Sequence, residues 1–427
     1  MKTSIPPLDL KAEFREVRFE LKRRINLIFG RGRFILGQEV AEFEERFSHF
    51  VGTKYSIGVA SGSDALLLGL MALGVRPGDE IITTPFTFVS TATAITRLGA
   101  KPVFVDIDPL TFNINPDFIK DKITERARGI IPVHLYGNPC RIDEICALAK
   151  RLGLFVVEDC AQACGATFRK KQVGSFGEFG AFSFYPTKTL GALGDAGAIT
   201  TNQKKLYEKI KSLHRHGEEG ADHSYRHTSI GINSRLDELQ AAILNVKLKH
   251  LEKWNQARRR AAERYNRFLH RVGISSDSYR MSFPRKRESA VTRFPTLSEK
   301  NVKFFPKSAP RMGASVKAFG NDSGDVRIIL PTETPNSRSV YHQYTIQITK
   351  RDQLLSYLRK LGISSSVYYP VPLHLQPCFR YLGYRRGDLP EAEKVSHSIL
   401  SLPLYPQIKV AEQQLVVKSI RNFFKAT

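Results

Sequence analysis

Cysteine is scarce in this chain of 427 residues, with five at positions 140, 146, 160, 164 and 378. They form no Cys-x-x-Cys pair and have no histidine partners at zinc spacing, so the sequence predicts neither a disulfide framework nor a metal site. Long apolar runs are missing too, and the N-terminal stretch MKTSIPPLDLKAEFREV lacks the apolar centre of a signal peptide. We therefore expect a soluble, cytoplasmic protein that has no membrane partner.

Acidic residues are outnumbered, with 41 Asp and Glu against 65 Lys and Arg and a net charge of +24. Such an excess can indicate nucleic-acid binding. Here the charge is spread along helix-like stretches such as KLKHLEKWNQARRRAAERYNRF, and no zinc finger, RNP motif or basic zipper concentrates it. We expect no nucleic-acid partner, and attraction for small phosphate-bearing molecules is the simpler interpretation.

Short apolar runs alternate with helix-like stretches through the first half of the chain. The runs are YSIGVA, EIITTP, KPVFVDI, GIIPVHLYG, LFVVED and GAFSFYP. Continuous Val, Ile and Phe between helices is typical of parallel strands that are covered on both faces. The pattern predicts an α/β fold with a mostly parallel sheet and right-handed crossovers.

Residues that directly follow these runs are the candidate site, because ligands of open α/β sheets bind beyond the carboxyl ends of the strands. One of them, Lys188, lies in FSFYPTKTLGALGDAGA among aromatic, small and hydroxyl residues. Apolar surroundings disfavour the charged form of a lysine and make its amine nucleophilic. The other candidates are Ser61, Gly62 and Ser63; Pro85 to Phe88; His134; Glu158, Asp159 and Gln162; and Ser183.

Each of these other candidates has a plain structural interpretation beside the functional one. The stretch SGSDA begins a helix and suits a phosphate group, but an ordinary helix N-cap explains it equally well. Asp159 ends an apolar strand, where it can pair with a protonated ring nitrogen or cap the next helix. Phe88 can stack on a planar ring, although core packing is the commoner role.

The combination is more specific than its members. A lysine that traps an aldehyde, a carboxylate for a ring nitrogen, an aromatic side chain for a ring face and a helix terminus for a phosphate together describe a pyridoxal phosphate pocket. The sequence therefore predicts pyridoxal phosphate as the cofactor.

Several motifs also resemble the DegT/DnrJ/EryC1/StrS family of nucleotide-sugar aminotransferases, over about Ile5 to Phe424. They are SGSDALLL, TTPFTFVSTATAI, AKPVFVDIDPLTFNI, IIPVHLYG, VVEDCAQACGA, FSFYPTKTLGALGDAGAI, GINSRLDELQAAIL and YYPVPLHLQPCF. The resemblance implies a fold-type I pyridoxal phosphate enzyme that works as a homodimer. Ser63 departs from the threonine and Cys164 from the histidine of many members, and neither change removes a needed group.

The resemblance also implies roles for individual residues. Lys188 would be the Schiff-base lysine, and Asp159 the partner of the pyridine nitrogen. Gln162 would lie against the ring and Phe88 would stack on it. The phosphate would be held by Gly62, Ser63 and Ser183, with Asn233 reaching it from the neighbouring subunit; Arg235 and His374 match positions on the sugar-nucleotide side.

The implied reaction transfers an amino group, usually from glutamate, to a keto group of a nucleotide-activated hexose, in amino-sugar or polysaccharide biosynthesis. Lys188 argues against the relatives in which histidine replaces the lysine and the enzyme is a dehydratase. The motifs PVHLYG and PFTFVSTATAI look more like members that act at the sugar C3 ketone. The alternative function is a catalytically inactive, cofactor-binding regulatory protein, and retention of Lys188 disfavours it.

The domain organisation changes after residue 250. Residues 1–250 are predicted to form the cofactor-binding large domain, and residues 251–427 a smaller α+β domain. INSRLDELQAAILNVKLKHLEKW predicts one long helix that links them, with Ser234 and Asp237 as a capping box. Residues 279–325 do not fit the family, carry ten Lys or Arg against four acids, and show no periodicity. We expect them to be a poorly ordered and dispensable insert.

Overall fold

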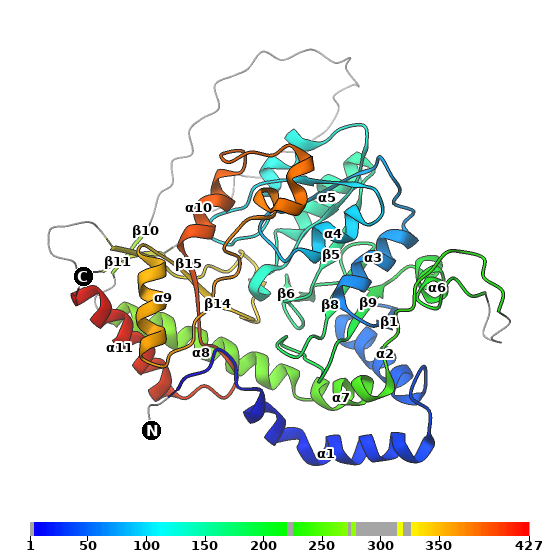
Figure 1. Ribbon diagram of the computed structural model, residues 1–427, viewed down its shortest axis with the longest axis horizontal. Coiled ribbons are helices and arrows are strands. Elements are labelled where there is room, and N and C mark those ends of the chain that lie inside the picture. Colours follow the sequence, from blue (N-terminus) through cyan, green and yellow to red (C-terminus); the bar gives the residue numbers. More distant parts are fainter. Residues whose placement is uncertain (1–3, 220–224, 272–274, 279–313, 319–325, 427) are drawn as a thin grey trace, which may run out of the picture.

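The computed structural model describes residues 4–219, 225–271, 275–278, 314–318 and 326–426. Within these residues, a seven-stranded sheet with helices on both faces forms the larger part of the molecule (Figure 1). Its strands are β1 (Tyr55–Val59), β2 (Glu80–Thr83), β3 (Lys101–Phe104), β4 (Ala127–Ile131), β5 (Phe155–Asp159), β8 (Phe179–Ser183) and β9 (Gly197–Thr201). The six apolar runs of the sequence each overlap one of these strands.

The strand order is β1-β9-β8-β5-β4-β2-β3. All neighbours from β8 to β3 pair in parallel, whereas β9 runs antiparallel to both β1 and β8. Strand β9 was not predicted from the sequence, because its residues GAITT are few and directly continue a run rich in Gly and Ala. The reversal between β8 and β9 is made by residues 184–196, the loop that carries Lys188.

Helices cover both faces because neighbouring residues of a strand point in opposite directions. Ile81 packs with the face covered by α3 (Gly62–Ala72), α4 (Ser90–Thr96) and α6 (Lys204–Leu213). Ile82 packs on the opposite face, against α5 (Ile142–Leu152). On that same opposite face Phe182 packs against α2 (Gln38–Val51) and α7 (Glu238–Leu248). The fold is mixed α/β with a mostly parallel central sheet, as predicted.

The expected long helix is divided in two. α7 ends at Leu248 and α8 (Leu251–Arg271) follows after a short break. Asp237 caps α7 by accepting a hydrogen bond from the Gln240 N–H at 2.8 Å. Ser234 does not join this cap: its hydroxyl donates to Asp64 of α3 at 2.8 Å. The capping-box prediction was therefore wrong: the helix begins at Glu238 with Asp237 itself as the N-cap, and the Ser234 hydroxyl bonds to α3 instead.

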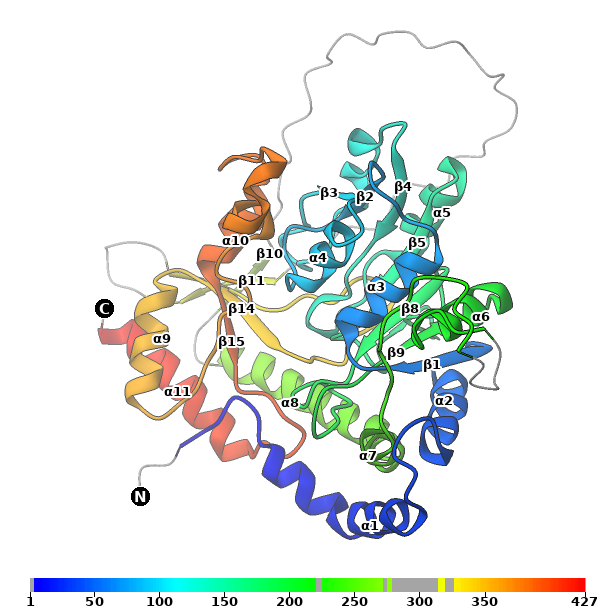
Figure 2. The same ribbon diagram turned by 45° about the vertical axis from the view of Figure 1, so that its right-hand side comes forward.

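Helix α1 (Leu10–Arg31) lies along the outer side of α7 and α8 (Figure 2). Val17 and Leu21 of α1 form a buried cluster with Ile243, Val246 and Trp254. The N-terminal helix is thus packed against the helices that support the Lys188 loop.

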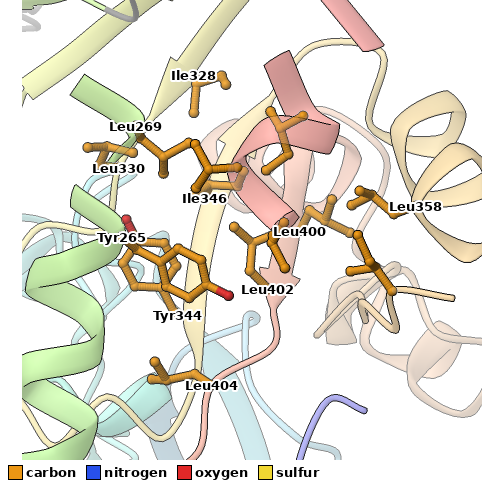
Figure 3. Close-up of a cluster of buried hydrophobic side chains, with 14 of the residues drawn as sticks. Tyr265, Leu269, Ile328, Leu330, Tyr344, Ile346, Leu358, Leu400, Leu402 and Leu404 are labelled. Carbon is orange, nitrogen blue, oxygen red and sulfur yellow. The ribbon is translucent and has the colours of Figure 1, made fainter. Parts of the chain in front are cut away.

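A second sheet, within the described part of the chain, has the antiparallel order β10-β11-β12-β14-β15. Its core combines the sheet with α8 and the C-terminal helices, and stacked rings of Tyr265 and Tyr344 lie at its centre with centroids 4.9 Å apart (Figure 3). The elements are β10 (Ser275–Ser278), β11 (Ala314–Ala318), β12 (Val326–Ile329), β14 (Tyr344–Ile348), β15 (Ile399–Leu402), α9 (Arg351–Lys360), α10 (Pro390–Ser398) and α11 (Val410–Ala426). A small three-stranded sheet joins β6 (Thr167–Phe168), β7 (Lys171–Gln172) and β13 (Ser337–Arg338).

The expected insert at 279–325 is not free of regular structure. Residues 314–318 form β11, which pairs with β10 on one side and β12 on the other. This strand is a correction to the sequence analysis, which saw no alternation there. The rest of the segment, residues 279–313 and 319–325, lies outside the described residues, and the division into two domains at residue 250 stays a prediction.

Among the described helices, none combines the length and apolar character needed to cross a bilayer.

Candidate functional site

Lys188 lies in the loop between β8 and β9, where backbone turns hold it in place. Its N–H donates to the Tyr185 carbonyl at 2.8 Å, and the Ala192 N–H donates to the Phe184 carbonyl at 2.7 Å. The side chain is half-buried. Desolvation by its surroundings lowers the pKa of Lys188 to about 8, while the nearby Asp159 carboxylate opposes that shift. A lysine of this kind is partly neutral near physiological pH and can act as a nucleophile.

Asp159 is the last residue of β5 and is buried. Burial raises the pKa of Asp159, and hydrogen bonds from Thr91 and Ala161 together with the charges of Lys188 and His134 oppose the rise. The Thr91 hydroxyl donates to Oδ2 at 2.8 Å, and the Ala161 N–H donates to Oδ1 at 3.1 Å. Each carboxylate oxygen keeps a lone pair that can accept a further donor.

The N-terminus of α3 meets the end of β8. A Cβ atom added to Gly62 would lie 2.6 Å from Cβ of Ser183, so only glycine allows this approach. Ser61 caps the helix by accepting from the Asp64 N–H at 3.1 Å, and the Ser63 hydroxyl lies 2.7 Å from that of Ser90. The N-cap interpretation is therefore correct for Ser61. The first amide groups of the helix still lack helical acceptors and suit an anion.

A polar and aromatic wall adjoins Asp159. The Gln162 amide oxygen accepts from the Tyr136 N–H at 2.8 Å, and its Nε2 donates to the Tyr369 hydroxyl at 3.1 Å. The Tyr369 ring lies 6.2 Å from that of Phe88. The Phe88 side chain is 55% exposed, so it is not a core residue and its ring has a face available for a ligand.

Asn233, Arg235 and His374 take part in none of the hydrogen bonds described above. Asn233 precedes α7 and accepts a hydrogen bond from Arg235 Nε at 3.0 Å. His374 lies in a short 3-10 helix, Leu373–Leu375, and its Nε2 lies 3.0 Å from Glu393 of α10. A role for these residues at the Lys188 site would need either a second subunit or a substrate long enough to contact them as well as Lys188.

Arg235 lines a cavity that the residues around Lys188 do not line. This cavity, of about 730 Å³, is also lined by Arg33, Lys211 and Arg215. Four basic side chains give it a positive character that suits an anionic group. Glu44, the carboxyl group in the lining, is buried enough that its pKa rises to about 7, although the Gly58 N–H donates to it.

One group of potential metal ligands occurs among the described residues: His134, Glu158 and Cys160, whose ligand atoms lie within 4.8 Å of one another. Their hydrogen bonds are already made. His134 Nε2 lies 3.1 Å from Glu158, and His134 Nδ1 accepts from the Cys140 N–H at 3.0 Å. Glu158 also accepts from three backbone amides, at Gly174, Phe176 and Gly177. The group supports the end of β5 beside Asp159.

Sequence reasoning missed Thr91 and Tyr369. Thr91 stands in TFVSTATAI, one of many hydroxyl residues there, and no local signal marks it as the partner of Asp159. Tyr369 is more than two hundred residues from Gln162 along the chain. Only the folded chain brings these partners together.

The arrangement fits pyridoxal phosphate. The charges of Lys188 and Asp159 interact, Gly62 lets the N-terminus of α3 approach Ser183 at the end of β8, and Phe88 has an exposed ring. These are the groups that such a cofactor requires.

Known proteins are similar to this chain in sequence and in fold. The family model "DegT/DnrJ/EryC1/StrS aminotransferase family" matches residues 16–309 and 317–421. A protein of Geobacillus stearothermophilus named "Pleiotropic regulatory protein" is 43% identical over 99% of both chains. UDP-2-acetamido-2-deoxy-3-oxo-D-glucuronate aminotransferase of Pseudomonas aeruginosa is 35% identical over 97% of this chain and 99% of its own.

Among solved structures, DesV of S. venezuelae in complex with a ketimine intermediate is similar. Its TM-score is 0.83 and its identity 34%, with 99% of both chains covered.

Proposed function

The chain belongs to the DegT/DnrJ/EryC1/StrS aminotransferase family, and from that premise we propose that it transfers an amino group to a keto group of a nucleotide-linked sugar. The cofactor is pyridoxal phosphate. The observation that carries the proposal is the pairing of the half-buried Lys188 with the buried Asp159 at the carboxyl edge of the sheet beside the α3 terminus.

We assign the cofactor contacts as follows. Lys188 would bind the aldehyde carbon through Nζ, and Asp159 would accept a hydrogen bond from the ring nitrogen. Phe88 and Gln162 would lie against the ring. The phosphate would be held by amides and hydroxyls of Gly62, Ser63 and Ser183.

When bound, pyridoxal phosphate supplies an electron sink and carries the amino group. Asp159 keeps the ring nitrogen protonated because its carboxylate is held in place by Thr91 and Ala161. Lys188 Nζ, once free of the cofactor, can take a proton from the substrate carbon and return it. Its lowered pKa suits both roles, since the amine must be neutral to accept a proton near pH 8.

We further propose that the site is completed in a homodimer. Asn233 would reach the phosphate of the partner subunit, and its exposed position in the single chain supports this role. Large apolar side chains of the N-terminal region, including Phe19, Phe29 and Phe34, are exposed in the single chain and would be covered in such a dimer.

The amino acceptor is proposed to be a 3-keto sugar linked to a nucleotide, with glutamate as the amino donor. The name of the Pseudomonas relative supports a 3-oxo sugar linked to UDP. Arg235 and the basic cavity beside it support an anionic substrate of this kind, and His374 would contact its sugar side. The product would enter amino-sugar biosynthesis, including that of polysaccharides, and the cytoplasmic location stays a prediction.

The alternative, an inactive regulatory protein, has a relative's name in its favour. A regulator needs no nucleophilic amine, however, and this chain keeps Lys188 in surroundings that lower its pKa. The site thus supports catalysis better than binding alone.

A substrate panel tests the proposal. The purified enzyme, supplied with pyridoxal phosphate and glutamate, is incubated with UDP- and dTDP-linked sugars that carry a ketone at C3 or at C4. We expect 2-oxoglutarate and an amino sugar to form in equal amounts with a 3-keto sugar. Turnover of 4-keto sugars alone would contradict the C3 assignment, and turnover of none would contradict the sugar substrate.

A further inference from the structure

A buried ion pair lies behind the loop that carries Lys188. Lys247 of α7 and Glu13 of α1 approach to 2.6 Å between Nζ and Oε1, and their side chains are only 3% and 4% exposed. The same Nζ donates a hydrogen bond to the Gly191 carbonyl at 2.7 Å. Gly191 is three residues after Lys188 in the loop. One ammonium group therefore joins the N-terminal helix to the loop of the reactive lysine.

The loop is tightly turned where Lys247 holds it. A Cβ atom added to Gly191 would lie 2.4 Å from the Pro186 carbonyl oxygen, so the chain folds back closely on itself. Hydrogen bonds from Lys188 N–H to Tyr185 and from Ala192 N–H to Phe184 enclose the same turn. Fixing the Gly191 carbonyl thus limits where the Lys188 backbone can lie.

Other buried groups depend on Glu13. Arg258 of α8 is buried, and desolvation lowers its pKa to about 10 while attraction to Glu13 opposes the shift. Burial also lowers the pKa of His342, and both Lys188 and Arg258 repel its protonated form. The Glu13 carboxylate therefore interacts with two buried cations, Lys247 and Arg258. Removing one member of such a group leaves the others uncompensated.

We propose that Glu13 and Lys247 are positioning residues that hold the Lys188 loop, so that Lys188 Nζ stays desolvated beside Asp159. The inference rests on the proposed function, because it assumes that Lys188 is the lysine that reacts. It gives the N-terminal helix a part in the active site, although no described residue of that helix is among the predicted cofactor contacts.

The first test replaces Lys247 with methionine, which keeps the length of the side chain and removes the donor. The pKa of Lys188 is measured in the cofactor-free protein, from the pH dependence of its reductive methylation by formaldehyde, followed by peptide mass spectrometry. We expect K247M to raise this pKa by about one unit, because a loosened loop admits water to the amine. In the loaded enzyme, kcat should fall about tenfold or more with little change in KM.

The matched control is Lys253→Met. Lys253 also pairs with a glutamate of α1, Glu16, but its side chain is 72% exposed and it makes no contact with the loop. We expect K253M to leave the pKa of Lys188 and kcat at the wild-type values. Equal effects of K253M and K247M would show that any loss of α1 contacts is sufficient, and would overturn the specific role of Lys247.

Glu13→Gln distinguishes the effect of releasing the loop from the effect of removing a negative charge near Lys188. Loss of a negative charge alone would lower the pKa of Lys188, whereas release of the loop would raise it. We expect E13Q to raise the pKa of Lys188, and the double variant to change it no more than either single one, because the pair acts as a unit. A fall or no shift in folded E13Q would overturn the proposal, and this variant decides alone if K247M is insoluble.

Failure of this inference and failure of the proposed function give different results. If E13Q turns over substrate like the wild type and the pKa of Lys188 is unchanged, the positioning role is refuted and the aminotransferase proposal stands. If the pKa of Lys188 shifts in E13Q but the wild-type protein turns over no keto sugar, the positioning role stands and the proposed function is refuted.

Discussion

At the scale of single residues, the proposed site is built from groups that stand at or beyond the carboxyl ends of strands. Lys188, Asp159 and Gly62 stand directly at or after strand ends, and the topology of a parallel sheet brings such positions to one edge. What the sequence did not show is how each group is held. The Thr91 bond to Asp159 and the Tyr369 bond to Gln162 join segments whose proximity depends on the whole fold.

Capture of the cofactor should depend on pH through Lys188. Only the neutral amine attacks an aldehyde, and the pKa of Lys188 is lowered to about 8. At least one unit below this pKa, each unit of pH therefore raises the neutral fraction about tenfold. We expect the rate at which cofactor-free protein binds pyridoxal phosphate to rise about tenfold from pH 6 to 7 and to level off above pH 8. Stopped-flow absorbance measures this rate. A rise that continues to pH 10 would show an unperturbed lysine.

At the scale of elements, apolar runs fixed the positions of the parallel strands but not of β9 or β11. β9 (GAITT) is short and directly continues a run rich in Gly and Ala. β11 (ASVKA) alternates, but over only five residues, within a segment that otherwise shows no periodicity. Both are defined by the partners on either side of them rather than by their own residues. Helix α7 shows the same limit, since Ser234 found a partner in α3 instead of capping.

Glu44 of α2 should make folding stability depend on pH. Its pKa is raised from the ordinary 4.5 to about 7 by burial. Between these values the folded protein retains a proton that the unfolded chain releases, so the free energy of unfolding falls as pH rises. We expect E44Q to have a higher Tm than the wild type at pH 8 and nearly the same Tm at pH 5. The control is Glu45→Gln at the neighbouring exposed position, whose Tm should follow the wild type at both pH values.

The strand β11 sets the limits of a tolerated deletion. Removal of residues 279–313 retains β11, whereas removal of 279–325 takes away the strand between β10 and β12. We expect the shorter deletion, with its ends joined by a short Gly/Ser linker, to keep cofactor binding and Tm close to wild type. The longer deletion should lower Tm by several degrees, because β12 loses one hydrogen-bonded neighbour. Equal Tm values for the two deletions would show that β11 adds nothing to stability.

At the scale of the whole molecule, the fold class followed from alternating strands and helices, and we propose that each site takes residues from two chains. In the single chain Asn233 is exposed, its Oδ1 accepts a hydrogen bond from Arg235 Nε, and its backbone pairs with that of Arg215. In the proposed homodimer Asn233 would complete the site of the partner subunit, so one site would require two chains. Apolar side chains such as Phe19 and Phe29, exposed in one chain, are consistent with this requirement.

Mixing two inactive variants tests that requirement. A mixed dimer of Lys188→Ala and Asn233→Ala has one site with both residues intact and one site with neither. If subunits exchange at random, half of the dimers are mixed, so we expect about a quarter of the wild-type activity to return. The measurement is turnover after the two variants are refolded together. Absence of recovery, with dimers formed, would place Asn233 in the site of its own chain.

The most direct test of the central claim is the visible absorption spectrum of the purified protein with pyridoxal phosphate, before and after glutamate, beside Lys188→Ala. The account predicts a yellow band that bleaches when glutamate is added, with one 2-oxoglutarate formed per site. It also predicts that Lys188→Ala, although it folds, completes no such transfer. A wild-type protein that shows no yellow band, or a band that glutamate leaves unchanged, would contradict the assignment of Lys188 as the lysine of a glutamate-dependent aminotransferase.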